Sequence, residues 1–190
     1  MTVIDADAVR AVALKLFAER GYTATTMADI GAALGVRGPS LYRYLQSKHD
    51  LLAEIMVATM TTLLADQAGA RSASSDPVLQ LRRMVEAHVR FHAGRRDEAF
   101  VGNREIDNLQ PPARTNVLKL RRRYERTLQS VIIAGIEKGA FQVDSPRLAS
   151  YAILDMGIGV SAWFRQGGPH TADEVAYAHA EYAVAILGGR

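Results

Sequence analysis

The sequence predicts an all-α protein, in which an N-terminal three-helix domain with a helix-turn-helix precedes a larger C-terminal helical domain. Apolar residues recur at three- and four-residue steps along most of the chain, which is the period of amphipathic helices. We find no sustained alternation of apolar and polar residues, and the connections between apolar stretches are short, as in helical folds. We expect the two domains to span residues 1–48 and 49–190.

The first helix is expected over residues 5–20. Its apolar positions lie at helical spacing and are Val9, Val12, Ala13, Leu16 and Phe17. Asp5 or Asp7 is placed to cap the start of this helix, and Gly21 suits its C-terminal end.

Eight further helices are predicted, separated by stretches rich in Gly, Pro and small polar residues. Their expected ranges are 27–34, 39–45, 48–68, 77–94, 99–108, 112–138, 146–165 and 171–187. The low-complexity stretch GARSASSDP at residues 69–77 is interpreted as a loop.

Composition excludes several classes of protein. The formal net charge of +3 permits a polyanionic partner without requiring one. Because the chain has no cysteine, disulfides and thiolate metal sites are excluded, which fits a cytoplasmic protein. No apolar run is judged long enough to span a bilayer, and the acidic N-terminus is not typical of a signal peptide, so no membrane partner is expected.

Residues 27–45 have the apolar pattern of a helix-turn-helix. The positions that would pack inward are Ile30, Leu34, Val36, Leu41 and Leu45. Gly31 falls where the two helices cross most closely, and Gly35 falls at the turn, where a positive φ is favoured. The hydroxyl of Thr26 can cap the first of these helices, and Pro39 suits the first turn of the second.

The outer side of the second short helix predicts contact with DNA. Its N-terminal end normally faces base edges, and Arg37 there could bind guanine with two hydrogen bonds, worth about 1–3 kcal/mol of discrimination. Tyr42, Tyr44 and Lys48 are placed to reach phosphates. The expected DNA contacts are Thr26, Arg37, Gly38, Pro39, Ser40, Tyr42, Arg43, Tyr44 and Lys48. The alternative is an ordinary helical hairpin in a bundle core.

The last two predicted helices have the broad apolar surface of an interface, and small residues between positions 152 and 162 would allow close helix approach. We expect a homodimer formed through these helices. Alternatively, they only cover the core of a monomer.

Several other patterns have simpler explanations. The sequence GIGVSA at residues 157–162 matches a dinucleotide-binding fingerprint, but it lies inside a predicted helix rather than after a strand. His88 and His92 are four residues apart and could bind a metal, although without a third fixed ligand they are more typical of a core or pocket. Arg121, Arg122 and Arg123 form either a solvated helix face or a site for an anionic ligand. No nucleophile or oxyanion motif is found, so we expect no enzyme, catalytic residue, metal or cofactor.

The segment LFAERGYTATTMADIGAALGVRGPSLYRYLQSKHDLL resembles the DNA-binding region of TetR-family regulators over residues 9–55. The matching residues are Phe17, Gly21, Tyr22, Thr25, Thr26, Ile30, Gly35, Val36, Leu41, Tyr42, Tyr44, Ser47, Lys48 and Leu51. Arg43, where the family often has Tyr, and Leu45, where it often has Phe, depart from the pattern. The resemblance implies a homodimer, a C-terminal domain that binds a small molecule, and repression that this ligand releases.

The segments HVRFHAGRRDEAFVGNREIDNL, LRRRYE and WFRQGG are similar to the C-terminal domain of the TetR branch that regulates fatty-acid or steroid catabolism, whose members often respond to acyl-CoA thioesters. An acyl-CoA needs an apolar cavity for its tail and arginines for its phosphates. The residues expected to bind it are Phe91, Phe100, Tyr124, Met156 and Trp163 for the tail, and Arg104, Arg122 and Arg165 for the head. The alternatives are an activator or effector-independent DNA-binding protein with this fold, or a helical ligand carrier or enzyme without DNA binding.

Overall fold

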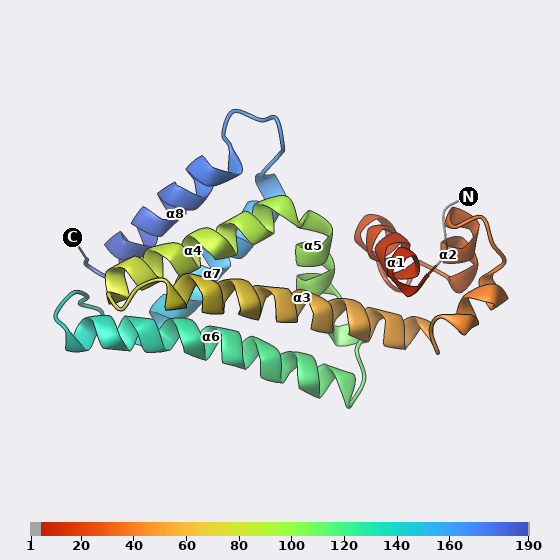
Figure 1. The fold of residues 1–190 in the computed structure, drawn as a ribbon, viewed down its shortest axis with the longest axis horizontal. Helices are drawn as coiled ribbons and strands as arrows, with labels where there is room; N and C mark the ends of the chain where they lie inside the picture. The colour runs from red at the N-terminus through yellow and green to blue at the C-terminus, as the bar shows by residue number, and fades with distance from the viewer. Residues whose placement is uncertain (1–4, 190) are drawn as a thin grey trace. The chain divides into compact units, whose positions relative to one another are not determined.

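The computed structural model describes residues 5–189 and confirms the all-α fold (Figure 1). No strand is found within these residues. In chain order, the helices are α1 (Ala6–Arg20), α2 (Met27–Ala33), the 3₁₀ helix η1 (Gly38–Arg43), α3 (Lys48–Ser72), α4 (Pro77–Gly94), α5 (Arg96–Arg104), the 3₁₀ helix η2 (Ile106–Asn108), α6 (Ala113–Glu137), α7 (Pro146–Trp163) and α8 (Ala172–Ile186).

Local capping signals set most helix ends. The carboxylate of Asp5 accepts a hydrogen bond from the Ala8 N–H at 2.8 Å at the start of α1, and Gly21 follows its end with a φ of +86°. Thr26 begins α2, where its hydroxyl accepts from the Asp29 N–H at 3.1 Å and the Asp29 carboxylate accepts from the Thr26 N–H at 2.8 Å. This reciprocal pairing satisfies two backbone donors that a helix start otherwise leaves free.

Two predicted elements differ from the sequence expectation. The second helix of the helix-turn-helix is a 3₁₀ helix, with i to i+3 hydrogen bonds from Ser40 N–H to Arg37 O and from Tyr44 N–H to Leu41 O. The helix expected at residues 99–108 begins earlier, at Arg96, and ends at Arg104, after which η2 follows.

The predicted loop at residues 69–77 is also partly wrong, because α3 continues through Gly69 to Ser72. A glycine inside a helix costs only about 1 kcal/mol relative to alanine, and both neighbours of Gly69 are alanines. The Gln80 side chain donates to the Arg71 carbonyl at 3.2 Å and to the Ser74 carbonyl at 2.7 Å, which satisfies acceptors at the end of the helix.

By length and composition, α3 is long and apolar enough to cross a membrane, contrary to the sequence expectation. Its apolar side chains are instead used inside the protein. The buried ones are Leu51, Leu52, Ile55, Met56, Met60 and Leu63. We therefore interpret α3 as a core helix.

The described residues form two compact units. The first contains the chain up to Met60 together with Asp97–Leu118, and the second contains Thr61–Arg96 and the chain from Lys119 onward. The first half of α3 thus belongs with the helix-turn-helix. The core of the first unit includes Val9, Phe17, Ile30, Leu41, Leu51, Leu52, Ile55, Met56, Val101 and Val117.

In the second unit, α4 packs against both α7 and α8 (Figure 1). Its core includes Leu81, Met84, Val85, Val89, Leu128, Ile132, Ile153, Val160, Ala176 and Ala180. Two ion pairs also join α4 to α8. Arg82 binds both carboxylate oxygens of Glu181, at 2.7 and 3.0 Å, and Arg90 binds Asp173 at 2.6 Å.

Candidate DNA-recognition surface and effector site

The turn between α2 and η1 requires glycine at two positions. A Cβ atom at Gly31 would lie 2.8 Å from both the Gly38 nitrogen and the Val36 carbonyl oxygen, so no side chain fits there. Gly35 has a φ of +71°, which favours glycine. These contacts confirm the close crossing and the turn expected from the sequence.

The two faces of η1 differ as a groove-reading element needs. Leu41 and Leu45 lie in the core together with Ile30 of α2, whereas Tyr42 is 55% exposed. Arg37, Pro39 and Arg43 are also exposed, and Gly38, Ser40 and Tyr44 are half-buried. The Arg43 guanidinium lies 5.6 Å from the centre of the Tyr44 ring. Polar and cationic groups therefore share one outer surface.

Three of the predicted DNA contacts have other contacts within the chain. Thr26 caps α2, as described above. A Cβ at Gly38 would lie 3.1 Å from the Met27 carbonyl oxygen, so Gly38 also lets η1 approach α2 closely. The Lys48 ammonium donates hydrogen bonds to the carbonyl oxygens of Tyr22 and Thr25, at 2.9 and 2.8 Å, and lies 4.1 Å from the centre of the Tyr22 ring.

A buried carboxylate completes this arrangement. Glu105, between α5 and η2, accepts from the Tyr22 N–H at 3.2 Å through Oε1 and from the Asn108 side-chain amide at 2.6 Å through Oε2. The contact between Tyr22 and Glu105 was not predicted from the sequence. They are 83 residues apart, and no local pattern links them.

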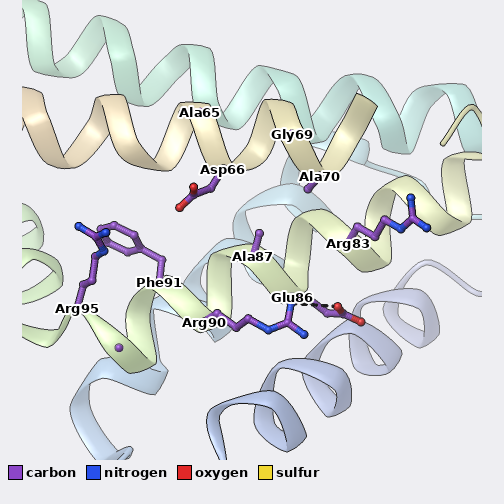
Figure 2. Close-up of a pocket in the computed structure, with 11 residues that line it drawn as sticks. Ala65, Asp66, Gly69, Ala70, Arg83, Glu86, Ala87, Arg90, Phe91 and Arg95 are labelled. Atoms are coloured by element: carbon purple, nitrogen blue, oxygen red, sulfur yellow. Dashed lines mark hydrogen bonds and ion pairs between the residues drawn. The ribbon is translucent and has the colours of Figure 1, made fainter. Parts of the chain in front are cut away.

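In the second unit, a groove of about 780 Å³ lies between α3 and α4 (Figure 2). It is lined by Ala65, Asp66, Gly69, Ala70, Arg83, Glu86, Ala87, Arg90, Phe91, Gly94 and Arg95. Of the predicted effector contacts, Phe91 lies in this groove. The groove combines one aromatic ring with three arginines and two acids.

The groove arginines are held by neighbouring groups. Arg90 binds Glu86 at 3.1 Å in addition to Asp173, and the hydrogen bond of its side chain to Asp173 raises its pKa above the usual value. Arg95 lies 5.7 Å from the centre of the Phe91 ring. Arg83 donates to the Ala73 carbonyl. Contacts within the chain thus fix all three guanidinium groups that line the groove.

A second, very small cavity of about 10 Å³ lies beside the buried His88 and Tyr124. The Leu154 carbonyl, at 3.0 Å from His88 Nε2, can only accept, so Nε2 carries the proton and Nδ1 accepts from the Tyr124 hydroxyl at 3.0 Å. Desolvation by burial lowers the pKa of His88 to about 4 and raises the pKa of Tyr124 above its usual value, so both groups are neutral at physiological pH.

His92 lies against the same cluster. Its ring centre is 4.5 Å from that of His88, and its buried Nδ1 has no hydrogen-bond partner within the chain. Desolvation, followed by the charge of His88, lowers the pKa of His92 to about 3. Among residues 5–189, no three His, Asp or Glu side chains are grouped as metal ligands would be.

The remaining predicted effector contacts do not line the groove. Phe100 and Arg104 lie in the first unit, where the Arg104 guanidinium is 4.3 Å from the Phe100 ring centre. In the second unit, Trp163 is 53% exposed and stacks on His179, and Arg165 donates to the Ala162 and Phe164 carbonyls at the end of α7. Arg122 is exposed and Met156 half-buried. The predicted set is therefore not brought together as one pocket.

The chain is similar to several known bacterial regulators. The curated repressor KstR2 of Mycobacterium tuberculosis is 28% identical over 180 residues, which are 94% of this chain and 88% of that protein. A crystal structure of a tetR-family regulatory protein from Rhodococcus RHA1 has a TM-score of 0.92 and 30% identity, with full coverage of both chains. The structure of AibR in complex with isovaleryl coenzyme A and operator DNA shares the fold, with a TM-score of 0.86, 22% identity and coverage of 93% of this chain and 96% of that one.

Two family models match separate parts of the chain. The model of bacterial regulatory proteins of the tetR family matches residues 9–55, and the model of a tetracyclin repressor-like C-terminal domain matches residues 74–187. Together they cover the helix-turn-helix, most of the second unit and the segment Asp97–Leu118 of the first. The chain belongs to the TetR family of bacterial DNA-binding transcriptional regulators.

Proposed function

We propose that this TetR-family regulator is a homodimeric repressor, which an acyl-CoA thioester releases from its operator. Membership of the family makes the chain a DNA-binding regulator rather than an enzyme. The observation that carries the DNA-binding part of the proposal is the two-sided η1, in which Leu41 is buried while Tyr42, and Arg37 just before the helix, face outward. We place the protein in the cytoplasm, where its operator is.

The proposed DNA contacts are those on the outer surface. Arg37 stands at the N-terminal end of η1 and reads a base edge, while Tyr42, Arg43 and Tyr44 bind phosphates. Gly38, Pro39 and Ser40 form the N-terminal end of η1, which we expect to lie closest to the DNA. Each half of a near-palindromic operator binds one subunit, with half-sites about one helical turn apart or somewhat more.

The proposed dimer interface is the apolar side of α7 and α8. Most of the large hydrophobic side chains exposed in the second unit gather on these two helices, and they are Leu148, Trp163, Tyr177, Tyr182 and Ile186. Exposed apolar residues concentrated in this way are typical of an interaction surface. The exposed Ala152, Gly159, Ala162 and Ala185 are small enough for the helices of two subunits to approach closely.

The proposed effector site is the groove between α3 and α4 (Figure 2). Arg83, Arg90 and Arg95 supply positive charge for a phosphorylated head, and Phe91 supplies apolar contact. Guanidinium groups suit phosphate because they donate several hydrogen bonds in a fixed plane. That AibR, which shares the fold, was crystallised with isovaleryl coenzyme A and operator DNA supports this class of effector.

Calorimetry with a short-chain and a long-chain acyl-CoA, and with free CoA as the control, tests the effector. An operator fragment would first be selected in vitro from random DNA by the full-length protein. We expect saturating acyl-CoA to weaken operator binding about 5- to 150-fold, which is the range of common allosteric couplings. An acyl-CoA that binds stoichiometrically but leaves operator affinity unchanged would contradict the proposed release.

The location of the head group is tested with Arg95→Gln and Arg122→Gln. The first removes a groove arginine, and the second removes an exposed cation that sequence analysis assigned to the head. If the groove is the site, Arg95→Gln weakens acyl-CoA binding and Arg122→Gln does not. The reverse result would favour the sequence-based assignment.

A further inference from the structure

Tyr22, in the corner between α1 and α2, is held at both ends of its backbone by opposite charges. Its N–H donates to the buried Glu105 carboxylate at 3.2 Å, and its carbonyl accepts from the Lys48 ammonium at 2.9 Å. Hydrogen bonds in which one partner is charged are stronger than neutral ones. Lys48 also covers the Tyr22 ring at 4.1 Å, a distance that suits a cation–π interaction.

We propose that Lys48 and Glu105 are positioning residues for DNA recognition, which fix this corner and with it α2 and η1, and that Lys48 does not bind a DNA phosphate. The inference goes beyond the repressor function above and depends only on the DNA binding of the family. We call Tyr22, Lys48, Glu105 and Thr25 the corner clamp.

The contacts of Lys48 support the statement that this residue does not bind a DNA phosphate. An ammonium has three N–H donors, and two of them bind the carbonyls of Tyr22 and Thr25, while the aromatic ring faces the same group. Moving this ammonium to a phosphate would leave the two carbonyls without this partner. Arg43, in contrast, is exposed on η1 and has the Tyr44 ring as its nearby contact.

The position of Thr25 links the clamp to the recognition element. Thr25 is fully buried, and its hydroxyl donates to the Gly21 carbonyl at 2.9 Å. The next residue, Thr26, caps α2, and α2 packs on η1 through Gly31 and Gly38. A shift of the Lys48-bound carbonyl of Thr25 is therefore passed directly to the start of α2.

Glu105 extends the clamp to a distant part of the chain. It is buried, with both carboxylate oxygens bonded, and it follows the last residue of α5. Leaving a buried carboxylate without its hydrogen-bond donors is strongly unfavourable, so these hydrogen bonds favour one position of Tyr22. The DNA-binding element thus depends on a residue outside the helix-turn-helix segment.

Salt dependence of operator binding distinguishes a positioning residue from a phosphate contact. Each phosphate contact that is lost reduces the slope of log K against log salt by about 0.9, whereas a displaced recognition element lowers affinity at every salt concentration. The full-length protein would be compared with Lys48→Gln, Lys48→Arg and Arg43→Gln, using the DNA fragment selected in vitro. Lys15→Gln, in the exposed part of α1, controls for the loss of one positive charge.

We expect Lys48→Gln and Lys48→Arg each to weaken binding about tenfold or more with an unchanged slope, because a charged hydrogen bond is lost and a planar guanidinium does not reproduce the ammonium geometry. Arg43→Gln should reduce the slope by about 0.9. A slope reduced by about 0.9 in Lys48→Gln, or wild-type binding by Lys48→Arg, would overturn the proposal.

The Glu105 part has a test that needs no DNA. Amide hydrogen exchange at Tyr22 would be measured in the wild-type protein and in Glu105→Ala and Glu105→Gln. We expect exchange at least tenfold faster in Glu105→Ala and an intermediate rate in Glu105→Gln, whose amide oxygen still accepts. Unchanged exchange in both variants shows that Glu105 does not hold the corner. If Glu105→Ala does not fold, the exchange rate at Tyr22 in Glu105→Gln is sufficient to test the role of Glu105.

Discussion

The ring of His88 on α4 occupies the space next to Gly157 on α7. A Cβ atom at position 157 would lie 2.7 Å from His88 Nε2, the atom that donates to the Leu154 carbonyl. The glycine that resembles part of a dinucleotide fingerprint is therefore explained by helix packing. It gives the buried imidazole room for its hydrogen bonds.

Gly157→Ala should accordingly destabilise the protein, by about 1–3 kcal/mol, because overpacking forces a buried group to move. Urea unfolding at pH 7 measures the free-energy change. Gly69→Ala is the matched control, since that glycine is also inside a helix but a Cβ there meets nothing within 4 Å. It should be neutral or stabilise by up to about 1 kcal/mol. Equal effects of the two substitutions would contradict the packing explanation.

The two buried histidines should make the free energy of unfolding depend on pH. In the folded protein the pKa values of His88 and His92 are about 4 and 3, whereas an unfolded histidine titrates near 6.5. Unfolding therefore takes up protons below pH 6.5, so this part of the stability is complete above that pH and is lost as the pH falls. Between pH 7 and 5 each histidine should remove about 2 kcal/mol.

His92→Phe isolates one of these contributions. His92 Nδ1 has no partner to lose, and phenylalanine preserves the ring. Urea unfolding at fixed protein concentration, repeated at pH 7 and pH 5, should show about half the wild-type loss in this variant. A pH dependence equal to that of the wild type would mean that His92 titrates normally in the folded protein.

The interface proposed on α7 and α8 is tested with two isoleucines of similar exposure. Ile186 on α8 is 43% exposed and Ile133 on α6 is 40% exposed. Ile186→Glu should convert the dimer to a monomer at micromolar concentration, because an unpaired charge buried in an interface costs about 3–5 kcal/mol. Ile133→Glu should leave the mass unchanged in light scattering. A dimeric Ile186→Glu variant would place the interface elsewhere.

Arg37→Ala should weaken binding to the preferred operator and also relax base preference at one position in each half-site. The loss of a two-bond contact with guanine corresponds to about 1–3 kcal/mol of discrimination. Selection of bound fragments from random DNA gives the base profile directly. Tyr42→Phe should lower affinity for all sequences alike, because a phosphate contact reads no base. An Arg37→Ala profile identical to that of the wild type would exclude direct readout by this residue.

Local signals predicted the helix-turn-helix well. The cap at Thr26, the turn at Gly35 and the buried Leu41 each depend on the residue type and its near neighbours, and the structure agrees with all three. Helix boundaries were predicted less well where contacts with another helix determine them. Gln80, which supports the carbonyls near the end of α3, comes from the next helix, so the extension to Ser72 had no local signal.

The groove was harder to predict than the recognition element. It is formed where α3 and α4 lie side by side, and its Arg90 is oriented by Asp173, which is 83 residues away. By residue type alone, Trp163 and Arg165 suit the chemistry of an effector as well as the residues that line the groove. Only the packing shows that Phe91 lies in this groove and that Arg165 binds the end of its own helix.

The involvement of Asp97–Leu118 in the first unit has a practical result for protein engineering. A chimera that joined only the N-terminal helices of this regulator to a foreign sensor would lack Glu105, and the Tyr22 amide would lose its acceptor. Grafting should therefore transfer this internal segment as well, or supply an equivalent carboxylate from the recipient. A new sensor joined in this way would keep the original operator specificity.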